Sequence, residues 1–131
     1  MSTDRRLFMS PPHMSGREQE IIAEVFDTNY IAPVGPHLAK FEEMFAEAVG
    51  LPHVVAVASG TAAIHLALRQ LELSADDEVW CSTLTFCASC NPIKYEGAQP
   101  VFIDSDWVSW NLDPNLIAEE LDRAAARNRL P

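Results

Sequence analysis

One turn of the sequence has residue types that could bind a phosphate group. In Ala58-Ser59-Gly60-Thr61, two hydroxyl residues flank a glycine between a short apolar run and a helical pattern. The first residues of a helix offer unpaired backbone N–H groups and a partial positive charge, and a glycine lets an anion approach closely. The turn therefore predicts a phosphate site. A simple helix cap is the alternative, because a cap needs only one of these hydroxyls.

A second candidate is Phe86, which follows Thr85 just beyond a strand predicted over residues 78–82. Ligands of open parallel sheets bind beyond the carboxyl ends of the strands. An aromatic ring at that place can stack on a flat cofactor. The alternative is a phenylalanine of the core, which is the commoner role for this residue type.

Two cysteines, Cys87 and Cys90, form a CxxC pattern at the start of a predicted helix. A helix N-terminus lowers a thiol pKa, so a small redox protein is one interpretation, and two buried, inert cysteines are the other. We expect no metal site, because a second cysteine pair is missing and the four histidines lack ligand spacing. With Cys81 the cysteines are odd in number, which indicates a reducing cytoplasm rather than a disulfide framework.

Carboxylates stand near the end of a third predicted strand. Asp104 ends that strand and Asp106 follows in the loop, where both could meet a ligand. Carboxylates in such places more often cap turns, as we expect of Asp113. We interpret the tryptophans as packing or interface residues; they are Trp80, Trp107 and Trp110.

The elements that must position these residues follow from the spacing of apolar side chains. Helices are predicted over about 16–28, 36–49, 62–73, 86–96 and 114–126, and strands over about 53–58, 78–82 and 100–104. The alternation from residue 53 onward predicts a parallel sheet covered by helices. The helix over 62–73 is apolar nearly all round and should be buried. On the helix over 36–49, Lys40 and Glu42 are placed on the outer face.

The ends of the predicted helices carry their own signals. The spacing of Ser15 and Glu18 fits a capping box. Pro36 suits a first helical position, and Gly50 is a plausible stop for the same helix.

Composition excludes several classes of protein. The chain has 131 residues, 48% of them hydrophobic and 21% charged, which is ordinary for one globular domain. Acidic residues outnumber basic ones by 19 to 9, and this balance argues against a nucleic-acid binder. No apolar run approaches the roughly 20 residues of a membrane span. The run Leu7-Phe8-Met9 after Arg5-Arg6 is too short for a secretory leader, so we expect a cytoplasmic protein.

Several runs, in order, resemble motifs of the DegT/DnrJ/StrS aminotransferases, which are fold type I enzymes that use pyridoxal phosphate (PLP) to aminate keto-sugars. The matching runs extend from about residue 14 to about residue 126. They are Gly35–Glu42, Ser59–Leu68, Asp77–Val79, Thr85–Ile93, Gly97–Asp104 and Asn111–Pro114. The resemblance implies an α/β fold: the N-terminal part of the PLP-dependent transferase large domain, with parallel strands, covering helices and an incomplete sheet. Residues 1–34 would form an N-terminal extension and first helix, and residues 35–131 a partial PLP-binding domain.

The resemblance also implies roles for matched residues. Gly60 and Thr61 would hold the phosphate of PLP, Ser59 would shape the turn, and Phe86 would stack on the pyridine ring. In the family the substrates are a nucleotide-linked keto-sugar and an amino-acid donor, with glutamate the expected donor, and the active site lies in a homodimer.

Departures from the family pattern set further expectations. Asp76 replaces a turn glycine. The Schiff-base lysine, the aspartate that keeps the pyridine nitrogen protonated and a glycine-rich segment follow later in family members. The two lysines, Lys40 and Lys94, do not match the lysine position. We therefore expect a truncated enzyme without a catalytic residue, inactive alone.

Two alternatives stay open, namely a PLP-dependent sugar dehydratase, which carries histidine in place of that lysine, and a CxxC redox protein. The family fold also places Val54–Ala58 at one sheet edge, far from the strands over 78–82 and 100–104. We expect this run to lack its native sheet partners, and either to stay unpaired or to close the gap by a non-native pairing.

Overall fold

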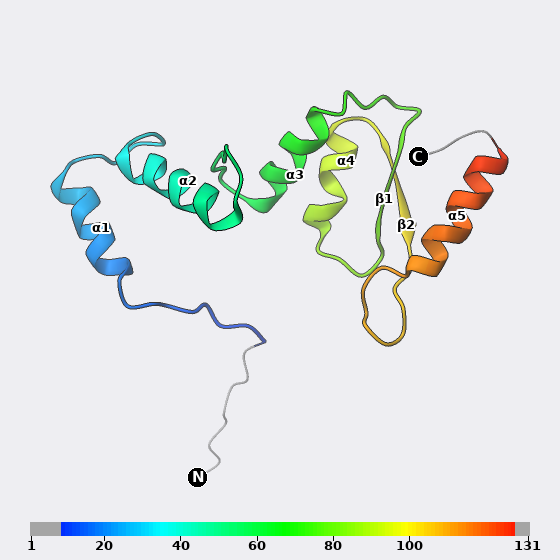
Figure 1. Cartoon of the computed structure of the whole chain (residues 1–131), viewed down its shortest axis with the longest axis horizontal. Helices are drawn as coiled ribbons and strands as arrows, with labels where there is room; N and C mark the ends of the chain where they lie inside the picture. Colours follow the sequence, from blue (N-terminus) through cyan, green and yellow to red (C-terminus); the bar gives the residue numbers. More distant parts are fainter. Residues whose placement is uncertain (1–8, 128–131) are drawn as a thin grey trace, which may run out of the picture. The chain divides into compact units, whose positions relative to one another are not determined.

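The computed structural model describes residues 9–127, which fall into two compact units (Figure 1). The first unit ends at Ala56 and the second begins at Val57. The family-based boundary after residue 34 stays a prediction. The expected absence of a secretory leader falls largely on residues 1–8, which lie outside the described residues.

The first unit holds two helices, α1 (Glu18–Asp27) and α2 (Pro36–Val49). Both predicted ends of α2 are confirmed, because Pro36 is its first residue and Gly50 ends it with a left-handed φ of 70°. The capping box at α1 forms only in part. The Glu18 carboxylate accepts hydrogen bonds from the Ser15 and Gly16 N–H groups, which lower the pKa of Glu18 to about 2.

The residue before α2 must be a glycine for steric reasons. Gly35 has a φ of 147°, which side chains rarely adopt. A Cβ atom placed on Gly35 would also lie 2.3 Å from Cδ1 of the Tyr30 ring. The Gly-Pro pair therefore combines a close backbone approach with a residue that starts a helix.

The predicted strand over residues 53–58 is wrong. Among the described residues this run pairs with no strand, which is one of the two outcomes expected for an incomplete sheet. A strand needs a neighbour to satisfy its backbone groups. Here Ala56 N–H donates to the Glu42 carboxylate instead, over 2.9 Å. The placement of Glu42 on the outer face of its helix is therefore wrong as well.

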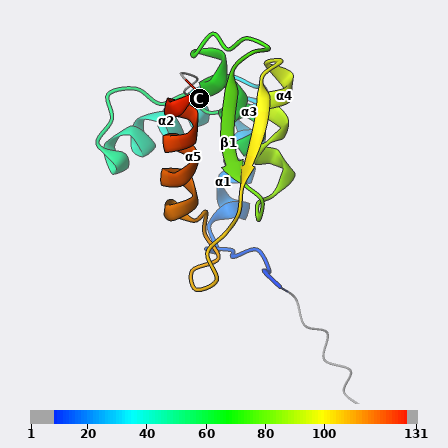
Figure 2. The same cartoon turned by 90° about the vertical axis from the view of Figure 1, so that its right-hand side faces the viewer.

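The second unit is built on two parallel strands, β1 (Glu78–Ser82) and β2 (Gln99–Ile103). In the register of this pair, Glu78 lies opposite Gln99 and Ser82 opposite Ile103. Figures 1 and 2 show helices α4 (Asn91–Tyr95) and α5 (Pro114–Ala126) on opposite sides of the two strands.

The crossover between the strands departs from the single helix predicted over 86–96. It consists of a short 3-10 turn, η1 (Cys87–Ser89), followed by α4. Pro92 has no N–H group to donate to the preceding turn, so a continuous helix would lose a hydrogen bond there. Cys90 N–H bonds to the Cys87 carbonyl three residues back, as a 3-10 turn requires.

The other helix of this unit, α3 (Gly60–Arg69), contacts η1 and α4. It is shorter than predicted, and none of its residues is buried, so the expected burial is wrong. Among the described residues its main packing partners are the short elements η1 and α4. The core of the unit is small and lies where α4 meets β2; its buried residues are Pro92, Ile93, Ala98 and Ile103.

Helix α5 begins as predicted, with the Asp113 carboxylate accepting a hydrogen bond from Asn115 N–H over 2.8 Å. Within residues 9–127, no helix is long and apolar enough to cross a membrane.

Candidate cofactor-binding site

The turn predicted to bind phosphate opens helix α3. Ser59 is extended, and its hydroxyl oxygen accepts a hydrogen bond from Ala62 N–H over 3.2 Å. The helix-cap interpretation of Ser59 is therefore correct, but this cap uses only one of the two hydroxyls. Gly60 and Thr61 are the first two helical residues, and no other described residue accepts from their N–H groups. Anion binding by these groups stays a prediction.

The surface of this turn is open. A Cβ atom added at Gly60 would meet no other atom within 4 Å. The glycine is thus not required by packing inside this unit. Its lack of a side chain leaves the two N–H groups accessible to a bound group, which is the condition that a phosphate site imposes.

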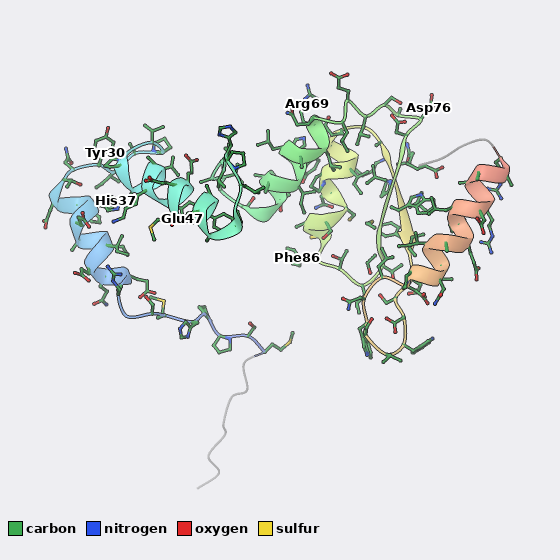
Figure 3. The ribbon with its side chains drawn as sticks, viewed as in Figure 1. Tyr30, His37, Glu47, Arg69, Asp76 and Phe86 are labelled. Carbon is green, nitrogen blue, oxygen red and sulfur yellow. The ribbon has the colours of Figure 1, made fainter. Side chains whose placement is uncertain are left out.

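The core interpretation of Phe86 is wrong for this structure, because the residue is 79% exposed. Phe86 precedes η1 at the end of the unit where β1 leads into that turn (Figure 3). The following turn is fixed by a 2.8 Å hydrogen bond between the Thr85 and Ser89 hydroxyls. An exposed ring beyond a strand end is available for stacking, although stacking on a cofactor stays a prediction.

Both candidate features belong to the second unit. Helix α3, which starts at the phosphate turn, contacts η1 and α4, which follow Phe86. Figure 1 shows α3 and α4 on the same side of the two strands. The second unit therefore carries both the candidate phosphate-binding turn and the exposed aromatic ring that could stack on a cofactor.

The three cysteines are free thiols. Cys87 is exposed, and the Cys90 Sγ atom lies 3.4 Å from the Cys87 carbonyl oxygen as a hydrogen-bond donor. Burial raises the pKa of the Cys81 thiol, and the nearby Cys90 raises it further. The absence of dithiol chemistry at Cys87 and Cys90 stays a prediction.

The carboxylates after β2 accept hydrogen bonds from residues near the strand ends. Asp104 accepts hydrogen bonds from Ser105 N–H and the Thr83 hydroxyl, at 2.8 and 2.9 Å. Asp106 accepts hydrogen bonds from the Ser109 hydroxyl and from the N–H groups of Ser109 and Val108. These bonds lower the pKa of both aspartates. The turn-capping interpretation therefore fits better than a ligand site.

A cavity of about 240 Å³ adjoins these aspartates, at the carboxyl ends of the two strands. Two of the three tryptophans, Trp107 and Trp110, line it and are exposed, so they do not pack in the core of this unit. Trp80 lies in β1 and is half-buried, and its ring N–H has no hydrogen-bond partner among the described residues.

Comparison with known proteins decides the family. Residues 12–126 match the DegT/DnrJ/EryC1/StrS aminotransferase family. The chain belongs to this family. EpsN of Bacillus subtilis (strain 168), provisionally named a pyridoxal phosphate-dependent aminotransferase, is 52% identical over 127 residues, which are 97% of this chain and 33% of EpsN. GDP-perosamine synthase of Escherichia coli O157:H7 is 41% identical over 110 residues, covering 84% of this chain and 30% of that enzyme.

Solved structures agree on the fold. Spr1654 of Streptococcus pneumoniae, provisionally named a sugar aminotransferase, was solved in a PLP form. It matches with a TM-score of 0.74 and 31% identity, over 88% of this chain and 29% of that one. The E. coli GDP-4-keto-6-deoxy-D-mannose-3-dehydratase shares the fold, with a TM-score of 0.75 at 23% identity over 84% of this chain and 30% of that one.

These comparisons fix the fold class and the cofactor of the family. The chain has the fold of the N-terminal part of PLP-dependent aminotransferases, and its described sheet is a two-stranded part of that domain. It spans about a third of the length of the curated relatives reported above.

Two carboxylates that join elements were missed by sequence reasoning. Glu42 bonds to Ala56 N–H within the first unit, and Glu96 bonds to His65 and Arg69 of α3 within the second. Glu42 lies in the matched Gly35–Glu42 run, which is a signal that could have found it. Glu96 follows no apolar period or motif, so only the packing of α3 on α4 identifies it.

Proposed function

We propose that this chain carries the phosphate-binding and ring-stacking part of a PLP site in a sugar aminotransferase. One observation supports this most directly: the second unit combines unpaired N–H groups at Gly60 and Thr61 with an exposed ring at Phe86. When bound, PLP supplies an electron sink for amino-group transfer. The chain's own residues would hold its phosphate and cover its ring.

The proposed substrates are a nucleotide-linked keto-sugar and glutamate as amino donor. The sugar proposal is supported by relatives such as the GDP-perosamine synthase at 41% identity. A glutamate donor and a homodimer are proposed from the family resemblance, and a cytoplasmic location from the odd number of cysteines.

We also propose that the 131-residue chain alone does not transaminate. The Lys94 ammonium group donates to the Ala98 carbonyl oxygen at 3.2 Å and to Gln99 Oε1 at 3.3 Å, at the turn between α4 and β2. The other lysine, Lys40, lies on α2 in the first unit. Neither lysine matches the Schiff-base position of the family, so neither supports a covalent link to a cofactor.

The dehydratase alternative is supported by the fold shared with the E. coli 3-dehydratase. The gene sequence that follows the Pro131 codon would separate the two chemistries. A lysine in an SxK segment supports the aminotransferase, and a histidine at that position supports the dehydratase.

Titration of the isotope-labelled chain with PLP, followed by nuclear magnetic resonance (NMR), tests the cofactor site. We expect PLP to shift the Gly60 and Thr61 amide signals and the Phe86 ring signals, and pyridoxal without phosphate to leave the amides unchanged. Thr61→Val should weaken PLP binding by about tenfold, as for the loss of one hydrogen bond to a charged group. Thr28→Val, which removes a hydroxyl at the end of α1, is the control. Unchanged amide signals with PLP would contradict the proposal.

A further inference from the structure

A carboxylate outside the predicted site joins the two helices that carry that site. Glu96 follows the last residue of α4, and its side chain is only 4% exposed. Its Oε1 atom lies 2.7 Å from His65 Nε2, and its Oε2 atom accepts a hydrogen bond from Arg69 Nη1 at 3.1 Å. Both partners belong to α3, so one carboxylate contacts that helix at two points.

The two partners lie on one face of α3. His65 and Arg69 are four residues apart, the spacing at which side chains of a helix are neighbours. The His65 ring also meets the Tyr95 ring edge to face, with centroids 5.3 Å apart. Together these contacts tie about one turn of α3 to the last residues of α4.

No other side-chain hydrogen bond among residues 9–127 joins α3 to η1 or α4. Close packing without hydrogen bonds, such as the contact of the His65 and Tyr95 rings, constrains direction less. Two hydrogen bonds to one carboxylate do fix a direction, because each needs a donor at a set distance and angle. The Glu96 contacts therefore set the position of α3 along α4.

The position of α3 along α4 matters because one candidate ligand-binding feature opens α3 and the other comes just before η1 and α4. The phosphate turn Ser59–Thr61 opens α3, and Phe86 comes directly before η1 and α4. A ligand whose phosphate and aromatic ring are joined by a short link can use both features only over a narrow range of separations. We infer that Glu96 is a positioning residue, which holds the phosphate turn and Phe86 at the separation that PLP requires. This inference rests on the proposed function.

Burial shows which substitution is informative. The carboxylate is buried, whereas the side chains of His65 and Arg69 are 42% and 73% exposed. Removing both partners would leave a buried charge without a hydrogen bond, which is costly. Removing the carboxylate leaves two donors that water can solvate. Glu96→Ala should therefore keep the fold while it releases the two elements from each other.

Two ligands separate positioning from general stability. Inorganic phosphate needs only the turn, whereas PLP needs the turn and Phe86 together. We expect Glu96→Ala to weaken PLP binding by about fivefold or more, the lower end of typical coupling between sites, and to change phosphate binding by less than about twofold. Glu96→Gln keeps an oxygen acceptor and should recover part of the PLP affinity. Glu119→Gln, which removes one charge from an exposed ion pair on α5, is the matched control.

The measurement is NMR titration of the 131-residue chain, followed at the Gly60 and Thr61 amides. A ratio of PLP to phosphate affinity that stays the same in Glu96→Ala would overturn the inference, and so would an equal loss of both affinities. If the unsubstituted chain binds neither ligand, the proposed function fails before any variant is made. If Glu96→Ala does not fold, Arg69→Met, which removes one donor from an exposed position, is tested in its place. The inference then requires that Arg69→Met weaken PLP binding more than phosphate binding.

Discussion

Two apolar runs of similar character have different structures in this chain. Gln99–Ile103 forms strand β2 and pairs with β1 along its whole length. Val54–Ala58 has three β-branched residues against two in Gln99–Ile103, yet among the described residues it has no strand partner. The difference teaches that composition makes a run suitable for a sheet, whereas a neighbouring strand decides whether the strand forms.

The surroundings of the two runs differ in the same way. Behind β2 lies helix α4, and the buried residues Ile93 and Ile103 pack where they meet. Val54–Ala58 is half-exposed or exposed throughout, and among residues 9–127 it is held by a hydrogen bond from Ala56 N–H to the Glu42 carboxylate. Stability should therefore be concentrated around β2 and be low around the unpaired run.

The largest expected effect comes from the core beside β2. Ile93 is 1% exposed, so Ile93→Ala should lower the free energy of unfolding of the second unit by about 2–4 kcal/mol through lost burial and a cavity. In the unpaired run, the exposed Val55 offers the matched change, and Val55→Ala should stay within about 0.5 kcal/mol. Urea unfolding followed by circular dichroism measures both. Equal losses would show that the unpaired run is as well packed as the strand.

A smaller effect is expected where the unpaired run is tied down. Glu42→Gln keeps an oxygen acceptor, whereas Glu42→Ala leaves Ala56 N–H without its partner, at a cost of about 1 kcal/mol. Hydrogen exchange at the Ala56 amide should speed up in the alanine variant and change less in the glutamine variant. Glu43→Ala on the exposed side of α2 is the control. No change at Ala56 in the alanine variant would mean that the carboxylate does not hold this run.

Local signals explain how much of this fold the sequence predicts. Helix ends are encoded by neighbouring residues, and so the starts at Pro36 and Asp113 and the stop at Gly50 could be read directly. The same holds for Ser59, whose cap depends on a residue three positions away.

Features that depend on distant residues could not be read in this way. The family sheet order left Val54–Ala58 either unpaired or in a non-native pairing, whereas its composition alone predicted a strand. The hydrogen bonds between Glu96 and α3 join residues that are 27 and 31 positions apart in the sequence, and no periodic pattern predicts them. The candidate site falls between these cases. The turn at Ser59–Thr61 is local, but the exposure of Phe86 depends on what packs around η1.

Acid should loosen the ends of the paired strands. Thr83, just after β1, donates to Asp104, just after β2, and this bond helps to keep the pKa of Asp104 below its ordinary value. A depressed pKa in the folded state contributes stability that is present above the unfolded pKa of about 4 and is lost as the pH falls further. Because Asp104 is exposed, the effect should be small. In the unsubstituted chain the Thr83 amide should lose protection from hydrogen exchange between about pH 5 and pH 2, and Asp104→Asn should reduce that loss. If the pH dependence is the same in Asp104→Asn, the loss of protection comes from other titratable groups.

The smallest effect concerns thiol reactivity and leaves the fold intact. Cys81 lies inside β1, where burial and the nearby Cys90 raise the pKa of its thiol, whereas Cys87 is exposed beyond the strand. The thiolate is the reactive form, so iodoacetamide at neutral pH should label Cys87 well before Cys81. Labelling sites can be read by peptide mass spectrometry. Faster labelling of Cys81 would show that β1 opens readily, which would remove the contrast with Val54–Ala58. The same samples test the redox alternative, because a readily formed and reduced bond between Cys87 and Cys90, with dithiol exchange activity, would favour it over the cofactor site.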